Sequence, residues 1–194
     1  QDYIVIGQKE TALEIIDKVK SKLMHPFNHI VGLGKMFLCN QYNEDIELLS
    51  EGMDDLDKFF EFKPHDQIKK FKLYGAAFKH LFNKEYDEAV NRFKDLEKAL
   101  PQVADNCKRD MIICYNRKGD FDSAIKIGKG LIRENPFNTR YLLEVVRSYI
   151  GNGDDDKANE ILTKLLGTWE NADDDYIPYQ EAKQMWKELN AEKK

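Results

Sequence analysis

Three short segments decide the fold: KEYDEA at Lys84–Ala89, GDFDSA at Gly119–Ala124 and GDDDKA at Gly153–Ala158. Their final alanines are 35 and 34 residues apart, so one local pattern recurs at a nearly constant step. A constant step of this length is the sequence signature of a repeated structural unit. The sequence therefore predicts three consecutive copies of one small helical motif.

Other features of the sequence keep the same step. A ring-bearing residue precedes each segment, a leucine follows each alanine, and a proline follows the first two units; these are His80, Tyr115 and Tyr149, Leu96, Leu131 and Leu165, and Pro101 and Pro136. Apolar residues elsewhere recur at helical spacing, which indicates helices joined by short turns along nearly the whole chain. The sequence therefore predicts an all-α protein.

The residue types within each segment have physical reasons. The first position needs a positive φ, which Gly119 and Gly153 adopt freely and Lys84 adopts with some strain. We expect the acidic residues that follow to cap the second helix and to face the positive end of its dipole. The alanine lets two paired helices approach closely, so we expect all three alanines to be buried between helices.

On these residues, the sequence resembles the tetratricopeptide repeat (TPR) family, in which helix–turn–helix units of about 34 residues stack into a superhelix. The resemblance implies a single right-handed α-solenoid domain of antiparallel helix pairs over residues 1–194. The expected parts, in chain order, are N-terminal helices with one degenerate repeat (8–65), three repeats within 70–169 (about 70–103, 105–138 and 139–172) and a C-terminal cap helix (173–194).

The composition excludes several classes of protein. Hydrophobic residues make up 42% and charged residues 34% of the chain, a balance that argues against global disorder. The net charge of −5 gives no electrostatic case for a nucleic acid as the main partner. No apolar run approaches the roughly 20 residues of a membrane span. Three cysteines without a Cys-x-x-Cys spacing argue against a disulfide framework and a zinc ribbon.

Candidate catalytic and metal-binding residues are few. His25 and His29 lie four residues apart, a spacing that can place two imidazoles on one helix face, but no glutamate follows His25 to complete a zinc motif. The acidic runs Asp154–Asp156 and Asp173–Asp175 lack the alternating ligands of a calcium loop. No arrangement of residues supports nucleophilic catalysis. We therefore expect a protein that is not an enzyme and that holds neither a metal nor a cofactor.

The resemblance also implies a concave groove, lined by exposed positions on the first helix of each pair. Carried over to this chain, the partner-binding residues are an aromatic stripe, Phe71, Tyr74, Phe78 and Phe82, and a set rich in arginine, Arg109, Ile113, Asn116, Arg117, Arg140, Leu143 and Arg147. Aromatic residues and arginine often anchor interfaces, and arginine can hold a carboxylate with two parallel hydrogen bonds. The alternative is that both sets are internal, with the aromatic stripe packed on the N-terminal helices and the arginines paired with Glu144 and Asp110.

The sequence predicts a scaffold that binds a peptide segment or a partner protein in this groove, the partner presenting carboxylates beside an apolar anchor. Two alternatives remain open: a tethering or oligomerisation module of a larger enzyme or transport protein, and a small-ligand or carbohydrate-binding domain of an exported protein. The acidic segment Glu44–Asp57 is a second candidate docking surface, for a basic partner. The start at Gln1 slightly favours an exported or periplasmic protein over a cytoplasmic one, although an excised segment can begin in the same way.

Overall fold

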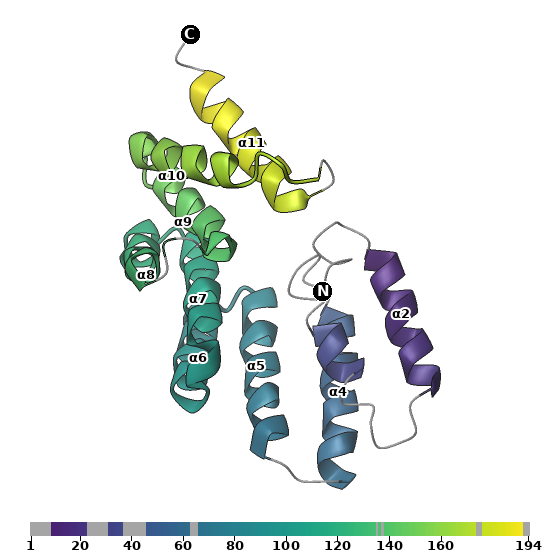
Figure 1. The fold of residues 1–194 in the computed structure, drawn as a ribbon. Helices are drawn as coiled ribbons and strands as arrows, with labels where there is room; N and C mark the ends of the chain where they lie inside the picture. The colour runs from purple at the N-terminus through teal and green to yellow at the C-terminus, as the bar shows by residue number, and fades with distance from the viewer. Residues whose placement is uncertain are drawn as a thin grey trace. The chain divides into compact units, whose positions relative to one another are not determined.

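The structure is a computed structural model that describes residues 9–22, 31–36, 46–62, 66–134, 136, 138–173 and 176–191. These residues are mostly helical and include no strand, which confirms the all-α prediction for the part of the chain described (Figure 1). Residues 31–36 are helical, and the other elements are α2 (Lys9–Lys22), α4 (Ile46–Phe62), α5 (Asp66–Phe82), α6 (Tyr86–Ala99), the 3-10 helix η1 (Pro101–Val103), α7 (Ala104–Lys118), α8 (Phe121–Glu134), α9 (Thr139–Gly151), α10 (Asp155–Thr168) and α11 (Ile177–Ala191).

The chain divides into two compact units, Gln1–Leu100 and Pro101–Lys194. The first unit contains α2, α4, α5 and α6, and the second contains α7 to α11. Within the units, α5 packs against α6, α7 against α8, and α9 against α10. Each of the three signature segments thus begins the second helix of one such pair. The expected repeat boundaries and the single solenoid domain stay predictions.

Each of the three turns has the same backbone geometry. The φ angle is 63° at Lys84, 81° at Gly119 and 75° at Gly153, in the left-handed region that the sequence predicts. The next N–H donates to the carbonyl five residues earlier at 2.9 Å in all three turns: Glu85 to His80, Asp120 to Tyr115 and Asp154 to Tyr149. These are the hydrogen bonds of a Schellman motif, which ends one helix and redirects the chain into the next.

The expected acidic residues stand at the start of α6, α8 and α10, and a side-chain cap bond is clearest at the second turn. Asp120 accepts a hydrogen bond at Oδ1 from a backbone N–H three residues later, at 3.2 Å. Glu85 and Asp154 make no side-chain cap bond. Their carboxylates contact the His80 ring and the Lys157 ammonium.

Close contact between helices depends on small residues. Ala89, Ala124 and Ala158 are each 0% exposed, as the sequence predicts. A Cβ placed on Gly128 of α8 would lie only 2.6 Å from Cγ2 of Val145 in α9. Such a distance is shorter than real carbon contacts, so a side chain at Gly128 would push these two helices apart. Small residues therefore allow close approach both within a helix pair and between α8 and α9.

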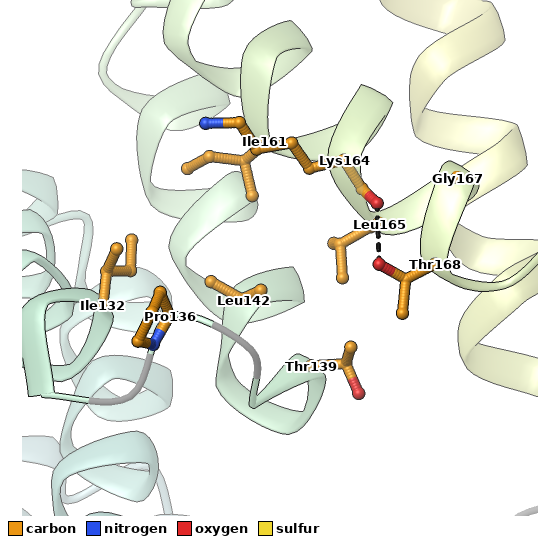
Figure 2. Close-up of a pocket in the computed structure, with 9 residues that line it drawn as sticks. All are labelled: Ile132, Pro136, Thr139, Leu142, Ile161, Lys164, Leu165, Gly167 and Thr168. Carbon is orange, nitrogen blue, oxygen red and sulfur yellow. Dashed lines mark hydrogen bonds between the residues drawn. The ribbon is translucent and has the colours of Figure 1, made fainter.

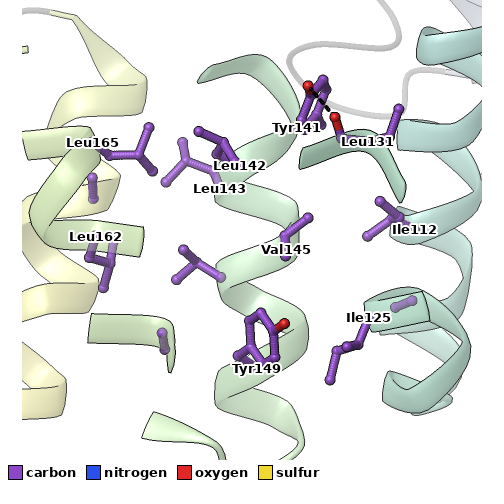
Figure 3. Close-up of a cluster of buried hydrophobic side chains, with 14 of the residues drawn as sticks. Ile112, Ile125, Leu131, Tyr141, Leu142, Leu143, Val145, Tyr149, Leu162 and Leu165 are labelled. Atoms are coloured by element: carbon purple, nitrogen blue, oxygen red, sulfur yellow. Dashed lines mark hydrogen bonds between the residues drawn. The ribbon is translucent and has the colours of Figure 1, made fainter. Parts of the chain in front are cut away.

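The second unit has a continuous apolar core, which Figure 3 shows as side chains that meet from neighbouring helices. Its members include Ile112 of α7, Leu131 of α8, Val145 of α9, Leu162 of α10 and Ala182 of α11. The Tyr141 hydroxyl, at the start of α9, donates a hydrogen bond to the Leu131 carbonyl at 2.9 Å. Polar and apolar contacts therefore hold α8 and α9 in register, and α11 contributes to the same core.

Replacing Ala124 by Leu should destabilise the protein by about 1–3 kcal/mol, because the larger side chain overpacks a fully buried contact. Replacing Lys126 by Leu introduces the same side chain at an exposed position of the same helix and should change stability by less than about 0.5 kcal/mol. Urea unfolding followed by circular dichroism measures both changes. Equal stabilities for the two variants would contradict the close packing at Ala124.

Candidate functional site

A cluster of charged and polar side chains lies on α7, α9 and α11 of the second unit. We call it the Glu144 cluster; its members are Arg109, Asp110, Asn116 and Arg117 of α7, Glu144 and Arg147 of α9, and Glu181 of α11. On α7, Arg109, Ile113, Asn116 and Arg117 are three or four residues apart and therefore share one helix face. The repeat geometry brings this face beside the equivalent face of α9, because α7 packs against α9.

Arg147 joins two helices through its guanidinium. Its Nη1 pairs with the Glu144 carboxylate on the same helix, and its Nη2 donates to Oε2 of Glu181 on α11 at 2.9 Å. The Arg147 side chain is still 37% exposed, and that of Glu181 is 46% exposed. Because both groups are accessible to solvent, an external carboxylate can compete with Glu181 for this arginine.

Arg109 has a different role, because its partner is buried. The Asp110 side chain is 0% exposed and accepts hydrogen bonds from Arg109 Nε at 2.9 Å and Nη2 at 2.6 Å. A carboxylate removed from water in this way is stabilised only by charged or hydrogen-bonding partners. Arg109 therefore stabilises the fold at Asp110, and only 16% of its side chain is exposed.

Asn116 connects α7 to the backbone of α9. Its Nδ2 donates to the Glu144 carbonyl oxygen at 2.9 Å, and the same carbonyl accepts a hydrogen bond from the Ser148 hydroxyl at 2.9 Å. The Asn116 Oδ1 atom is buried and has no hydrogen-bond partner among the described residues. A buried acceptor without a partner lowers stability by about 1–3 kcal/mol. Asn116 therefore stabilises the α7–α9 contact through its Nδ2 atom and destabilises it through its Oδ1 atom.

The charges of the cluster act on Glu144 in opposite directions. Burial raises the pKa of the Glu144 carboxyl above its ordinary value, while Arg147, Arg109 and Arg117 act to lower that pKa. All three arginines are therefore close enough to Glu144 for their charges to be felt. Burial also raises the pKa of the nearby Cys114 thiol to about 12, so this cysteine is a packing residue and not a nucleophile at neutral pH.

Some of the expected groove residues lie close together around Glu144, and others are buried in the core. Arg109, Arg117 and Arg147 lie around Glu144, which is the internal pairing that the sequence offered as an alternative, although Arg117 remains exposed. Ile113 and Asn116 are half-buried, and Leu143 is a core residue. The side chain of Arg140 lies outside those that the structure describes.

The expected aromatic stripe is largely internal to its helix pair. Phe78 is 1% exposed, and its ring centroid lies 4.7 Å from that of Tyr74 and 5.4 Å from that of Phe93 on α6. Phe82 packs on Phe78 at 5.7 Å, and the side chain of Phe71 is outside the described part of the chain. Phe78 therefore stabilises the α5–α6 contact and offers no surface to a partner. Helical spacing could not distinguish the two faces of α5, because both carry large apolar residues.

Several acids of the Glu44–Asp57 segment bind lysines within the first unit. Lys35 is buried and lies 2.6 Å from a Glu51 oxygen and 3.4 Å from a buried Asp55 oxygen, while Asp57 pairs with Lys72. Burial acts to lower the Lys35 pKa, but the Glu51 and Asp55 partners outweigh it and raise that pKa. Sequence analysis missed this cluster because its members come from different helices. Glu44 itself lies outside the described residues.

Among the described residues, no three His, Cys, Asp or Glu side chains lie together in a way that could hold a metal ion; His25 and His29 lie outside these residues. None of the described helices is both long enough and apolar enough to cross a membrane.

Comparison with known proteins shows the fold. No protein-family model matches the sequence, and no curated protein matches it. A structure of nearly identical TPR-like repeats of a putative kinesin light chain from Podosopora anserina aligns with a TM-score of 0.50 and 14% identity, over 87% of this chain and 96% of that one. The structure of the P58(IPK) TPR domain aligns with a TM-score of 0.49 and 20% identity, over 96% of this chain and 54% of that one, so this chain spans about half its length. The chain therefore has a TPR-like helical-repeat fold.

Replacing Arg109 by Ala should destabilise the protein by about 3 kcal/mol or more, because Asp110 would remain buried without the guanidinium. Replacing Arg133 by Ala, at an exposed position of α8, should change the free energy of unfolding by less than about 0.5 kcal/mol. Urea titration of both variants measures the difference. A small effect of Arg109→Ala would show that Asp110 does not depend on this pair.

Proposed function

We propose that this chain is a non-catalytic scaffold that binds a carboxylate-bearing segment of another protein on the surface formed by α7, α9 and α11. The TPR-like fold supports a protein-interaction scaffold. The observation that carries the choice of surface is the grouping of Arg109, Arg117 and Arg147 around Glu144. Arginine is enriched at the energetically important positions of protein interfaces.

The arginines of this surface divide into a structural one and two that a partner can reach. Arg109 holds buried Asp110, whereas Arg117 is exposed and Arg147 is partly exposed. A partner carboxylate that replaces Glu181 on Arg147 exchanges one ion pair for another, and the displaced Glu181 returns to water. Such an exchange desolvates less charge than burying a new pair would.

An apolar contact beside these arginines comes from α7. Ile113 is half-buried and lies on the face that carries Arg109 and Arg117. A partner side chain that covers Ile113 removes apolar surface from water, while its neighbouring carboxylate reaches an arginine. The expected ligand therefore combines an apolar side chain with a nearby Asp, Glu or C-terminal carboxylate. This anchor takes the place of the aromatic stripe, because Phe78 is buried.

Selection from a random peptide library displayed on phage tests this proposal. Peptides that bind the wild-type chain should be enriched in carboxylates beside an apolar residue. The double variant Arg117→Glu/Arg147→Glu should weaken their binding by about tenfold or more, because two attractive charges become repulsive. Raising the salt concentration should weaken wild-type binding as well.

The matched control is Lys126→Glu/Arg133→Glu, which makes the same change of charge at exposed positions of α8. It should leave the affinity of the selected peptides within about twofold of wild type, and both variants should keep the helical circular dichroism signal. Peptides rich in lysine and arginine, or equal losses in both double variants, would contradict the proposed surface.

A further inference from the structure

A separate pocket opens between α8, α9 and α10 of the second unit, and none of the Glu144 cluster lines it. Its volume is about 550 Å³, and the side chains that shape it include Ile132, Thr139, Leu142, Ile161, Leu165 and Thr168. Figure 2 shows these side chains around a common space, with the ring of Pro136 at one side. The volume falls within the range of about 300–1,000 Å³ that is typical of small-molecule sites.

The floor of this pocket is fixed by the core. Leu142 and Leu165 are 7% and 1% exposed and belong to the apolar core of the second unit, whereas Ile132 and Ile161 are half-buried walls. Because both leucines are held in the core, the floor of the pocket is set by the packing of α9 and α10. The pocket is thus a property of the helix packing.

Gly167 leaves one side of the pocket open, because it has no side chain. It lies within the last turn of α10, and a Cβ placed on it would meet no atom within 4 Å. A glycine inside a helix is about 1 kcal/mol less favourable than alanine, and here neither a positive φ nor a close neighbour requires it.

The charges around the pocket favour an uncharged occupant. Among the described residues that line it, Lys164 alone is ionisable, and its ammonium donates to Oε1 of Glu160 at 2.7 Å. In Figure 2 the Lys164 side chain runs past Ile161, so its ammonium lies away from Thr168. The ion pair leaves this rim close to neutral, and an anionic ligand would have to compete with Glu160 for the lysine.

The hydrogen-bonding groups favour a ligand that carries a hydroxyl. The Thr168 hydroxyl donates to the Lys164 carbonyl at 2.9 Å, which leaves its oxygen lone pairs as acceptors. A hydroxyl can donate to this oxygen, whereas an ether oxygen or a carboxylate cannot. Thr139, at the first position of α9, also lines the pocket, and Figure 2 shows its hydroxyl directed away from Thr168.

From this geometry we propose that the pocket between α8, α9 and α10 binds an uncharged apolar small molecule with one hydroxyl group, of the class of medium-chain and alicyclic alcohols. The hydrocarbon part lies on Leu142, Leu165 and the two isoleucines, and the ligand hydroxyl donates to the Thr168 oxygen. This site is independent of the proposed partner surface, because it uses other residues on other helix faces. The two proposals can therefore fail separately.

A displacement assay on the full chain tests the proposal with three matched probes. The neutral dye N-phenyl-1-naphthylamine reports occupancy by its fluorescence, and 1-decanol, decanoate and decyl methyl ether compete with it. Decanol should displace the dye at a concentration about tenfold lower than either competitor, a difference of about 1.4 kcal/mol. Decanoate should bind more weakly because its head group is charged. The ether should bind more weakly because it has no hydroxyl hydrogen to donate to the Thr168 oxygen.

Variants locate the binding to this pocket. Gly167→Leu fills the open wall and should reduce decanol affinity by about tenfold or more. The control is Gly130→Leu in α8, where an added Cβ also meets nothing within 4 Å but which does not line the pocket, so decanol affinity should not change. Thr168→Val, which barely alters volume, should remove the preference for decanol over the ether while the ether still binds.

Three results would overturn the proposal. One is the absence of saturable dye binding, which would leave the pocket as a contact for a partner protein or as empty space. Another is an equal loss of decanol affinity in the Gly167→Leu and Gly130→Leu variants when both keep the wild-type circular dichroism spectrum. The third is tighter binding of decanoate than of decanol. If Gly167→Leu does not fold, the test rests on Thr168→Val. A preference for decanol over the ether that stays as large as in the wild type would then overturn the proposal.

Discussion

The close packing of the two helices in each pair depends on two residues. One is a turn residue with a positive φ, and the other is a small side chain at the helix contact. Lys84, Gly119 and Gly153 adopt positive φ, and five residues later Ala89, Ala124 and Ala158 are fully buried. Because each turn sets the direction of the next helix and each alanine sets its distance, the two features together fix the pair. The positions of α7 and α9, and hence of the arginines on them, follow from this local constraint.

The features that sequence analysis predicted are those determined by residues close together in the chain. The positive φ at Gly119 and the burial of Ala124 depend on a few neighbouring residues, so their pattern repeats visibly. The ion pair between Asp154 and Lys157, three residues later, was not predicted, because residue type alone does not settle which donor a carboxylate binds. The buried ring of Phe78 was missed because apolar spacing does not tell which helix face is covered.

The two candidate sites show the same limit. Four arginines could be placed on α7 and α9 from the repeat step, but the partner of Arg147 on α11 lies 34 residues further along the chain. No local pattern connects Arg147 with Glu181. The pocket is harder still to predict. Gly167 contributes to it only by having no side chain, and the sequence does not show which helices surround that position. Such a space exists only once the packing of α8, α9 and α10 is known.

Binding of a carboxylate-bearing partner on α7, α9 and α11 should leave its trace in the backbone amides of these helices. Amide hydrogen exchange followed by mass spectrometry, with and without a bound acidic peptide, tests it most directly because it reports every helix at once. The account predicts slower exchange in peptides that cover Ile113–Lys118, Glu144–Gly151 and the first turns of α11, with α4 and α8 unchanged. Protection confined to α4 within the acidic Glu44–Asp57 segment, or to α8, would contradict it.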